Sequence, residues 1–205
     1  WGVPFDSIPK RITSRIPKTK NKENPTWFKG QKYQCVPRHG YTEMFNKMLS
    51  GIEVRLNIGP EEWKRESADL TVYTGKIDSY FGFSFGKLPY RSLKFIHETN
   101  PSAREDFVIN ENNSKSKYTR SYDHSFFTEG HKGSTIITKE YPIKCEGDNI
   151  PYYPIPWGEG QEIYSKYKDL SLKESGVIFT GRLATYKYLD MWMAVKQCMQ
   201  KLKNI

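Results

Sequence analysis

The sequence predicts a mixed α/β (α+β) fold, and three observations support this prediction. Residues 161–175 and 190–203 have helical periodicity and enclose a short apolar run at 176–181, a helix–strand–helix order. The middle of the chain holds several short runs rich in β-branched and aromatic residues, which are typical of strands. Hydrophobic residues make up 37% and aromatic residues 15% of the 205 residues, which is enough to build a core.

The N-terminal region is expected to hold few regular elements. Four prolines and six interleaved Lys or Arg residues in residues 1–25 exclude a long helix, and fit either a solvated basic loop or a wall that faces an anion. Residues 40–50 predict a short helix with Thr42 as a cap. Residues 52–58 alternate like a strand, 61–66 are ambiguous, and 68–75 predict a buried strand that ends at Gly75.

The rest of the chain is expected to be a succession of strands followed by two helices. Residues 80–96 alternate aromatic and small residues, which favours antiparallel strands with glycine bends. Further strands are predicted at 106–111, 117–124, 134–143 and 176–181, an extended segment at 148–156, and helices at 161–175 and 190–203. The last helix is expected to turn Met191, Ala194, Val195, Cys198, Met199 and Leu202 inward.

Charge and cysteine usage narrow the possible functions. The net charge of +9, from 32 Lys and Arg against 23 Asp and Glu, favours an anionic partner such as nucleic acid, a membrane surface or a phosphorylated small molecule. The three cysteines form no CxxC pair, and no histidine lies at metal-ligand spacing, so no metal site is predicted. Sparse cysteines and the lack of an apolar run long enough to span a bilayer predict a cytoplasmic protein without membrane insertion.

Cations and phenols recur together, most densely between residues 181 and 190. A strand that ends at Gly181 and a helix that starts at Asp190 would present free N–H groups to an anion. Arg182 would add a fixed cation there, and Tyr186 and Tyr188 could donate their hydroxyls. Asp190 as a simple helix cap is the alternative interpretation. Arg–Tyr pairs also stand at Tyr90-Arg91 and around Arg120, and Tyr152-Tyr153 lies on a rigid extended segment. Several such pairs in one chain favour a shared pocket for a diphosphate and a sugar.

The motifs KRITSRIP, GYTEMFNKML, YTG, FGKLPYRSLKF, YTR, PYYPI and GRLATYKYLDM, taken in this order, resemble the C-terminal half or slightly more of UDP-galactopyranose mutases. The resemblance implies an antiparallel substrate-binding sheet, over 1–50 and 80–150, beside C-terminal parts of a Rossmann-like FAD domain, over 51–79 and 151–205. The family's dinucleotide-binding motif and helical domain would lie before Trp1. We therefore expect a fragment that retains little FAD and is inactive alone.

The resemblance also implies a mechanism, a cofactor and partners. Members of the family interconvert UDP-galactopyranose and UDP-galactofuranose: N5 of reduced FAD attacks the anomeric carbon and expels UDP, and the sugar adduct opens and recloses as the furanose. The expelled diphosphate needs cations, which accounts for the arginines better than nucleic acid does. A homodimer is a further expectation, and the product would serve polysaccharide synthesis.

The resemblance implies roles for individual residues, at the positions where this sequence matches the family's motifs. Catalytic roles are implied for Trp1, Arg15 and Arg120, and FAD contacts for Gly75, Arg182, Asp190 and Met191. Substrate contacts are implied for Asn110, Tyr153, Tyr188, Asp190, Trp27 and Arg91. Trp27 stands where the family often has tyrosine, so the aromatic ring is kept and the hydroxyl is lost.

Two other functions remain open from the residues. A related flavin-dependent oxidoreductase would show sustained reduction of its flavin by substrate. A non-catalytic basic module that binds nucleic acid or acidic glycan through residues 10–22 would show affinity that falls steeply with salt.

Overall fold

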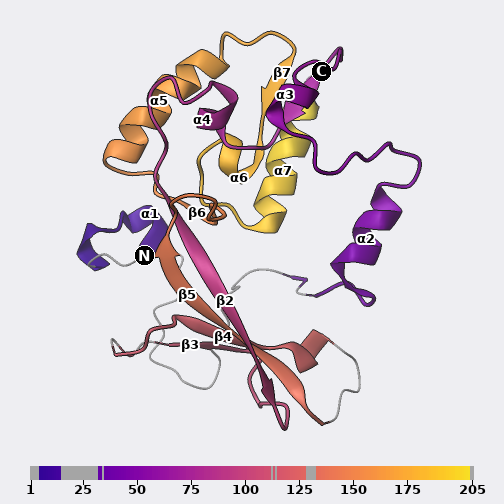
Figure 1. Ribbon diagram of the computed structural model, residues 1–205, viewed down its shortest axis with the longest axis vertical. Helices are drawn as coiled ribbons and strands as arrows, with labels where there is room; N and C mark the ends of the chain where they lie inside the picture. The colour runs from indigo at the N-terminus through magenta and orange to yellow at the C-terminus, as the bar shows by residue number, and fades with distance from the viewer. Residues whose placement is uncertain are drawn as a thin grey trace. The chain divides into compact units, whose positions relative to one another are not determined.

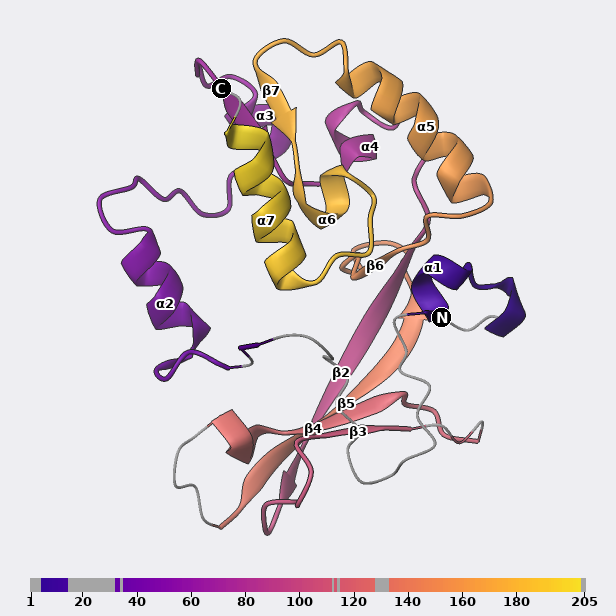
Figure 2. The ribbon, with the colours of Figure 1, turned by 180° about the vertical axis from the view of Figure 1, so that it is seen from behind.

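The structure is a computed structural model and describes residues 5–14, 32–33, 35–111, 113, 115–127 and 133–203 (Figures 1 and 2). The chain forms two compact units: residues 1–56 with 94–142, and residues 57–93 with 143–205. The assignment of substrate-binding and FAD-binding roles to the segments 1–50, 51–79, 80–150 and 151–205 stays a prediction.

The first unit combines short helices with most of an antiparallel sheet. Its elements are η1 (Phe5–Ser7), α1 (Lys10–Thr13), α2 (Gly40–Met48), β3 (Val108–Asn110), β4 (Arg120–Asp123) and η2 (His124–Phe127). Strands β2 (Tyr90–Asn100) and β5 (Thr135–Lys144) contribute most of their residues to this unit. The sheet order is β3-β4-β5-β2-β6, and β3 with β4 and β4 with β5 pair antiparallel.

The second unit holds a parallel strand pair among helices. Its elements are α3 (Pro60–Trp63), β1 (Thr71–Tyr73), α4 (Ile77–Tyr80), β6 (Tyr153–Pro154), α5 (Glu159–Ser171), β7 (Val177–Phe179), α6 (Gly181–Ala184) and α7 (Met191–Leu202). Strands β1 and β7 pair parallel, with Val72 opposite Ile178. The expectation of a mixed α/β fold with an antiparallel sheet is thus confirmed, and the second sheet is found to be parallel.

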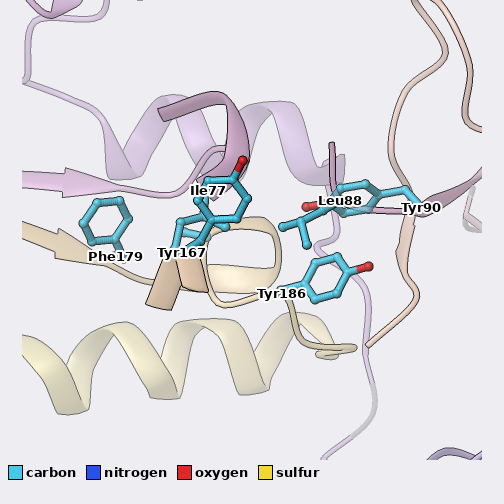
Figure 3. Close-up of a cluster of buried hydrophobic side chains, with 7 residues drawn as sticks. Ile77, Leu88, Tyr90, Tyr167, Phe179 and Tyr186 are labelled. Carbon is cyan, nitrogen blue, oxygen red and sulfur yellow. The ribbon is translucent and has the colours of Figure 1, made fainter. Parts of the chain in front are cut away.

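The core of the second unit is aromatic. Its buried side chains are Ile77, Leu88, Tyr90, Tyr167, Phe179, Ala184 and Tyr186 (Figure 3). The Tyr167 hydroxyl donates to the Gly86 carbonyl at 2.8 Å and accepts from the Phe85 N–H at 2.9 Å. The Tyr186 hydroxyl contacts the Pro89 carbonyl and accepts from the Ile155 N–H at 3.2 Å. The hydroxyls of Tyr167 and Tyr186 therefore provide hydrogen-bond partners for buried N–H and carbonyl groups of the loops.

Several expected elements differ in the structure. Residues 52–58 form no strand, and Asn57 has a φ of 59°, which is incompatible with an extended run. Residues 80–89 end helix α4 and turn instead of forming a strand, because Gly82, Phe83 and Gly86 adopt positive φ. Helix α2 starts at Gly40, with His39 rather than Thr42 at the N-cap position.

Two expectations about burial were also wrong. Strand β1 is not fully buried, since Val72 is 40% exposed. Helix α7 turns Met191, Val195, Met199 and Leu202 outward, with exposed fractions between 40% and 72%. The inward side of α7 carries Gln197, whose side chain is hydrogen-bonded to the backbone that follows β7, and this contact fixes the orientation of the helix.

Candidate functional site

The carboxyl ends of the two parallel strands form the frame of the candidate site. The ladder continues past β7, where the Thr180 N–H donates to the Tyr73 carbonyl at 3.0 Å. Gly181 has a φ of 82°, a conformation that favours glycine. At Gly75, an added Cβ would lie 2.6 Å from the Tyr73 hydroxyl, so any other residue would require the Tyr73 ring to move. Ligands of open parallel sheets bind at this end of the strands.

Arg182 follows this turn and lies against two tyrosine rings. Its guanidinium carbon is 4.5 Å from the Tyr188 ring centroid and 5.0 Å from that of Tyr153. The two rings are themselves 5.6 Å apart at an interplanar angle of 33°. Arg182 Nη1 also donates to the Leu189 carbonyl at 3.1 Å. The three side chains form a cluster with a delocalised cation and two phenol groups, which is suited to an anionic ligand.

The elements that carry this cluster are fixed by backbone pairing and by the core. Tyr153 lies on β6, opposite Arg91 on β2, and the Tyr152 N–H donates to the Arg91 carbonyl at 3.0 Å. Directly opposed residues project to the same face of a sheet, so Arg91 and Tyr153 are neighbours. The expectation that Tyr186 donates its hydroxyl to an anion was wrong, because Tyr186 is buried and its hydroxyl contacts the Pro89 and Ile155 carbonyls. With a φ of 46°, it anchors the loop that leads to Tyr188.

The start of helix α7 differs in part from the expectation. Asp190 occupies the N-cap position of α7, but its side chain makes no capping hydrogen bond. Met191 is the first residue of α7 and is 72% exposed. The interpretation of Asp190 as a simple cap therefore lacks the contact it requires, and a role towards a ligand stays a prediction.

Two residues of α7 that sequence reasoning missed support the turn before Arg182. The Gln197 side-chain carbonyl accepts from the Gly181 N–H at 2.8 Å and from the Thr180 hydroxyl at 3.3 Å. The Lys201 ammonium donates to the Phe179 carbonyl, and burial lowers its pKa. The signal that could have identified them is their spacing of four residues on one face of the last helix.

A second cluster lies on the antiparallel sheet of the first unit. Arg120 Nε donates to the Asn110 side-chain carbonyl at 2.8 Å, since the two residues are opposite each other on β4 and β3. Arg120 Nη1 donates to the Tyr122 hydroxyl at 3.3 Å, and this hydroxyl donates to the buried carboxylate of Glu140. Asn110, Arg120, Tyr122 and Glu140 therefore form one hydrogen-bonded chain across three strands.

This chain of contacts fixes the cation and changes the acidity of the phenol. Burial, followed by the hydrogen bond to Glu140, raises the pKa of Tyr122 to about 12 although Arg120 acts against the increase. Tyr122 and Glu140 were not among the predicted site residues. Tyr122 could have been identified, because its spacing of two residues from Arg120 places both side chains on the same face of a strand. Glu140 could not, because its pairing with Arg120 across β4 and β5 cannot be read from the sequence.

The structure brings together Arg120 with Asn110, and Arg182 with Tyr153 and Tyr188. Arg91 lies opposite Tyr153 on β2, and Gly75 lies in the loop that follows β1. Trp1, Arg15 and Trp27 lie outside the described residues. The role of each predicted residue, and their union in one pocket, stay predictions. Among the described residues no three His, Cys, Asp or Glu side chains gather as a metal site, and no helix is long and apolar enough to cross a membrane.

Comparisons with known proteins point to one family. The family model described as UDP-galactopyranose mutase matches residues 1–188. A dTDP-fucopyranose mutase of Escherichia coli is 32% identical over 98% of this chain and 55% of its own length. A probable UDP-galactopyranose mutase of Klebsiella pneumoniae is 32% identical over 98% of this chain and 53% of its own. The UDP-galactopyranose mutase of Mycoplasma genitalium is 32% identical over the whole chain and 55% of its own length.

Proposed function

Because the chain belongs to the UDP-galactopyranose mutase family, we propose that it forms part of an enzyme that interconverts UDP-galactopyranose and UDP-galactofuranose. The observation that carries the proposal is the cluster of Arg182, Tyr153 and Tyr188 at the carboxyl end of the parallel pair, in a chain that matches the family over residues 1–188. The chain spans about half the length of the curated relatives it matches, so the proposed activity is that of a longer protein.

The residues present fit one side of a site for FAD. Gly75 and Gly181 allow close turns at the ends of β1 and β7, where a dinucleotide can approach the backbone, and Arg182 supplies a cation beside them. When bound in its reduced form, FAD supplies a nucleophilic nitrogen that permits sugar rearrangement without net redox change. Gly75, Arg182, Asp190 and Met191 are the residues of this chain that would hold it.

The remaining residues are proposed to bind and orient the nucleotide sugar. Arg120, fixed by Asn110 and Tyr122, keeps a guanidinium in one orientation, as the binding of a diphosphate leaving group requires. Tyr153 and Tyr188 would donate their hydroxyls to phosphate oxygens, and Arg91 would add positive charge next to Tyr153. Trp1, Arg15 and Trp27 are proposed to complete the sugar, diphosphate and base contacts.

The test is an assay of the longer protein under reducing conditions, with UDP-galactofuranose as substrate and formation of UDP-galactopyranose as the readout. We expect turnover, and a loss of at least a hundredfold in kcat/KM for Arg120→Ala, which corresponds to about 2.7 kcal/mol. The 205-residue chain alone should retain little FAD and show no turnover. Stoichiometric flavin and normal activity in the isolated chain would contradict the proposal that it is one part of the enzyme.

A second substrate follows from one of the comparisons. The relative from Escherichia coli is named a dTDP-fucopyranose mutase, and its identity to this chain equals that of the relatives named for UDP-galactopyranose. A second assay should therefore run in the opposite direction, with UDP-galactopyranose and dTDP-fucopyranose as alternative substrates, and the larger kcat/KM identifies the preferred one. We also infer a cytoplasmic protein, which is supported by the absence of disulfides among Cys35, Cys145 and Cys198.

A further inference from the structure

A turn of exposed residues follows helix α4 and carries two exposed aromatic rings. Residues 82–87 are all exposed, and Phe83 and Phe85 are 37% and 40% exposed. Helices α4 and α5 lie side by side in Figures 1 and 2, and the Phe85 ring contacts that of buried Tyr167 on α5, with centroids 5.3 Å apart. Phe83 is not among the described side chains that pack against the core.

Phe83 has a backbone conformation that an aromatic residue rarely adopts. Its φ is 59°, in the left-handed region that favours glycine, and the preceding Gly82 has the same φ. The Phe83 N–H donates to the Asp78 carbonyl at 2.8 Å, and the Phe83 carbonyl accepts from the Gly86 N–H at 2.8 Å. Because this conformation costs free energy at an aromatic residue and the ring is not buried in return, folding alone does not account for a phenylalanine here.

Buried groups of the same unit fix the shape of the turn. The carboxylate of buried Asp78 accepts from the Leu88 N–H at 2.9 Å. The hydroxyl of buried Tyr167 accepts from the Phe85 N–H at 2.9 Å and donates to the Gly86 carbonyl at 2.8 Å. A turn that is fixed in this way loses little conformational freedom when it binds a partner.

Lysine amines surround the two exposed rings. Lys76 Nζ is 5.9 Å and Lys87 Nζ is 5.6 Å from the ring centroid of Phe83. Lys166 Nζ, from α5, is 5.8 Å from the ring centroid of Phe85. In the part of the chain that the structure describes, none of these three amines forms an ion pair with a carboxylate. Their positive charge is therefore available to an anionic partner.

We propose that residues 82–87 dock the protein on the surface of a lipid bilayer that contains anionic lipids. The rings of Phe83 and Phe85 enter the boundary between headgroups and acyl chains, and the amines beside them contact the lipid phosphates. The net charge of +9 adds long-range attraction to the same surface. This contact is peripheral and needs no helix that crosses the membrane. The inference goes beyond the proposed mutase activity and does not depend on it.

Single-stranded nucleic acid is the other anionic partner that aromatic rings and lysines bind, by stacking of a base on the ring. The amines of Lys76 and Lys87 stand over the Phe83 ring, where a base would have to stack. An apolar layer needs no free ring face, and lysine amines reach the phosphates while their aliphatic stems stay beside the ring. The arrangement therefore favours the lipid surface.

The experiment measures co-sedimentation of the 205-residue chain with vesicles of phosphatidylcholine, alone or with about 30% phosphatidylserine. We expect about tenfold stronger binding to the anionic vesicles, and a decrease as the salt concentration rises. Phe83→Asn removes the ring and supplies a residue that tolerates positive φ, so the fold should be retained in urea denaturation. The same variant should bind the anionic vesicles about fivefold more weakly.

Two lysine pairs of equal charge separate the local contact from the effect of net charge. Lys87→Gln with Lys166→Gln removes amines beside the rings and should weaken binding about tenfold. The control, Lys168→Gln with Lys173→Gln, removes the same charge at exposed positions and should change binding by less than about twofold. In Phe83→Trp, brominated acyl chains should quench the added indole fluorescence, relative to the wild type, because residue 83 reaches the acyl boundary.

Equal binding to the two kinds of vesicle, equal effects of the two lysine pairs, or no added quenching in Phe83→Trp would each overturn the proposal. Preferential binding of a mixed-sequence single-stranded DNA, lost in Phe83→Asn, would assign the turn to nucleic acid instead. The longer protein is tested in the same way, and vesicle binding by the 205-residue chain alone would mean that the remaining polypeptide covers the turn. Mutase activity is not a readout, so failure of this proposal leaves the proposed function intact.

Discussion

The guanidinium carbon of Arg182 lies 4.5 Å from the ring centroid of Tyr188, within the range of a cation–π contact. Tyr153 adds a second ring at 5.0 Å, from a strand about thirty residues earlier in the chain. Because residues from β6, α6 and the loop before α7 meet at this arginine, the cluster couples three segments of the second unit. It is both a structural contact and the centre of the proposed ligand site.

Replacement of Arg182 by lysine should therefore destabilise the isolated chain. Lysine keeps the charge but loses the planar contact with the two rings, so we expect the free energy of unfolding to fall by roughly 1 kcal/mol. The measurement is urea denaturation followed by circular dichroism. Tyr188→Phe is the control, since it keeps the ring and should change the stability by less than about 0.5 kcal/mol.

A double-mutant comparison measures the coupling between Arg182 and Tyr188. In a Tyr188→Ala background, the cost of Arg182→Lys should shrink, because one of its two aromatic contacts has already been removed. Equal costs in the two backgrounds would mean that the ring contributes nothing to holding the arginine.

Tyr122 is the link between Arg120 and the buried Glu140, so its hydroxyl is predicted to matter for both. Tyr122→Phe removes the donor to Glu140, which is 6% exposed, and should lower the free energy of unfolding by about 1–3 kcal/mol. Adding Glu140→Gln should recover part of this loss, because a neutral amide is less costly to bury without that donor. A double variant less stable than Tyr122→Phe would contradict this account.

The Tyr122 hydroxyl should ionise at a higher pH than an ordinary tyrosine. With its pKa raised to about 12, the neutral Tyr122 contributes stability that is fully present below about pH 10, the usual tyrosine value, and is lost as the pH rises through about 12. Ultraviolet difference titration of the wild type and Tyr122→Phe isolates this group. A difference spectrum that develops near pH 10 would show that Tyr122 ionises normally.

Sequence reasoning succeeded where a pattern is local. Strand β5, with its run of β-branched residues, and helix α5, with helical periodicity, lie close to their predicted ranges of 134–143 and 161–175. Residues 52–58 have an equally good alternation but form no strand, because a strand requires a partner that local sequence does not specify. Pattern alone thus predicts propensity rather than pairing.

The candidate site was predictable only in part for the same reason. Arg182, Tyr153 and Tyr188 were identified through their motifs, and the structure brings them into contact. Glu140 was missed because its closeness to Arg120 depends on the register of β4 and β5. The direction of α7 was predicted wrongly because Gln197 and Lys201 find backbone acceptors and donors inside, and these contacts outweigh the apolar periodicity.

Asp123 should make the first unit sensitive to acid. Its fully buried carboxylate accepts from the Arg104 N–H at 2.7 Å, the Thr135 hydroxyl at 2.7 Å and the Ser125 N–H at 2.9 Å. Burial alone would raise the pKa of Asp123, but these hydrogen bonds outweigh it and hold the pKa well below the usual value. The stability from this group is present above about pH 4 and is lost as the pH falls through the depressed pKa.

The measurement is the difference in unfolding free energy between the wild type and Asp123→Asn from pH 7 to pH 2. We expect this difference to be largest at neutral pH and to shrink on acidification, while contributions from other carboxylates cancel. Asp106→Asn, at an exposed position, serves as the control and should show a small difference at every pH. A pH-independent difference for Asp123→Asn would mean that its charge does not stabilise the fold.

Gly160 provides a test of how the core supports the candidate site. It lies in the first turn of α5, and an added Cβ would collide with the Ile155 carbonyl and lie 2.7 Å from the Tyr186 hydroxyl and 2.9 Å from Pro89 Cγ. Gly160→Ala must therefore displace Tyr186 or the backbone it holds. Because crowding of a closely packed site costs about 1–3 kcal/mol, we expect a loss of stability in this range by urea denaturation.

The position of Tyr186, two residues before Tyr188, extends this prediction to the site. Gly160→Ala should shift Tyr188 relative to Arg182, so ligand affinity in the longer protein should fall together with stability. Gly59→Ala is the matched control, because its Cβ would meet the Glu62 carboxylate at 3.8 Å, an ordinary contact, with no positive φ. If Gly160→Ala lost stability but kept full affinity for the nucleotide sugar, the packing of Tyr186 would be independent of the arginine cluster.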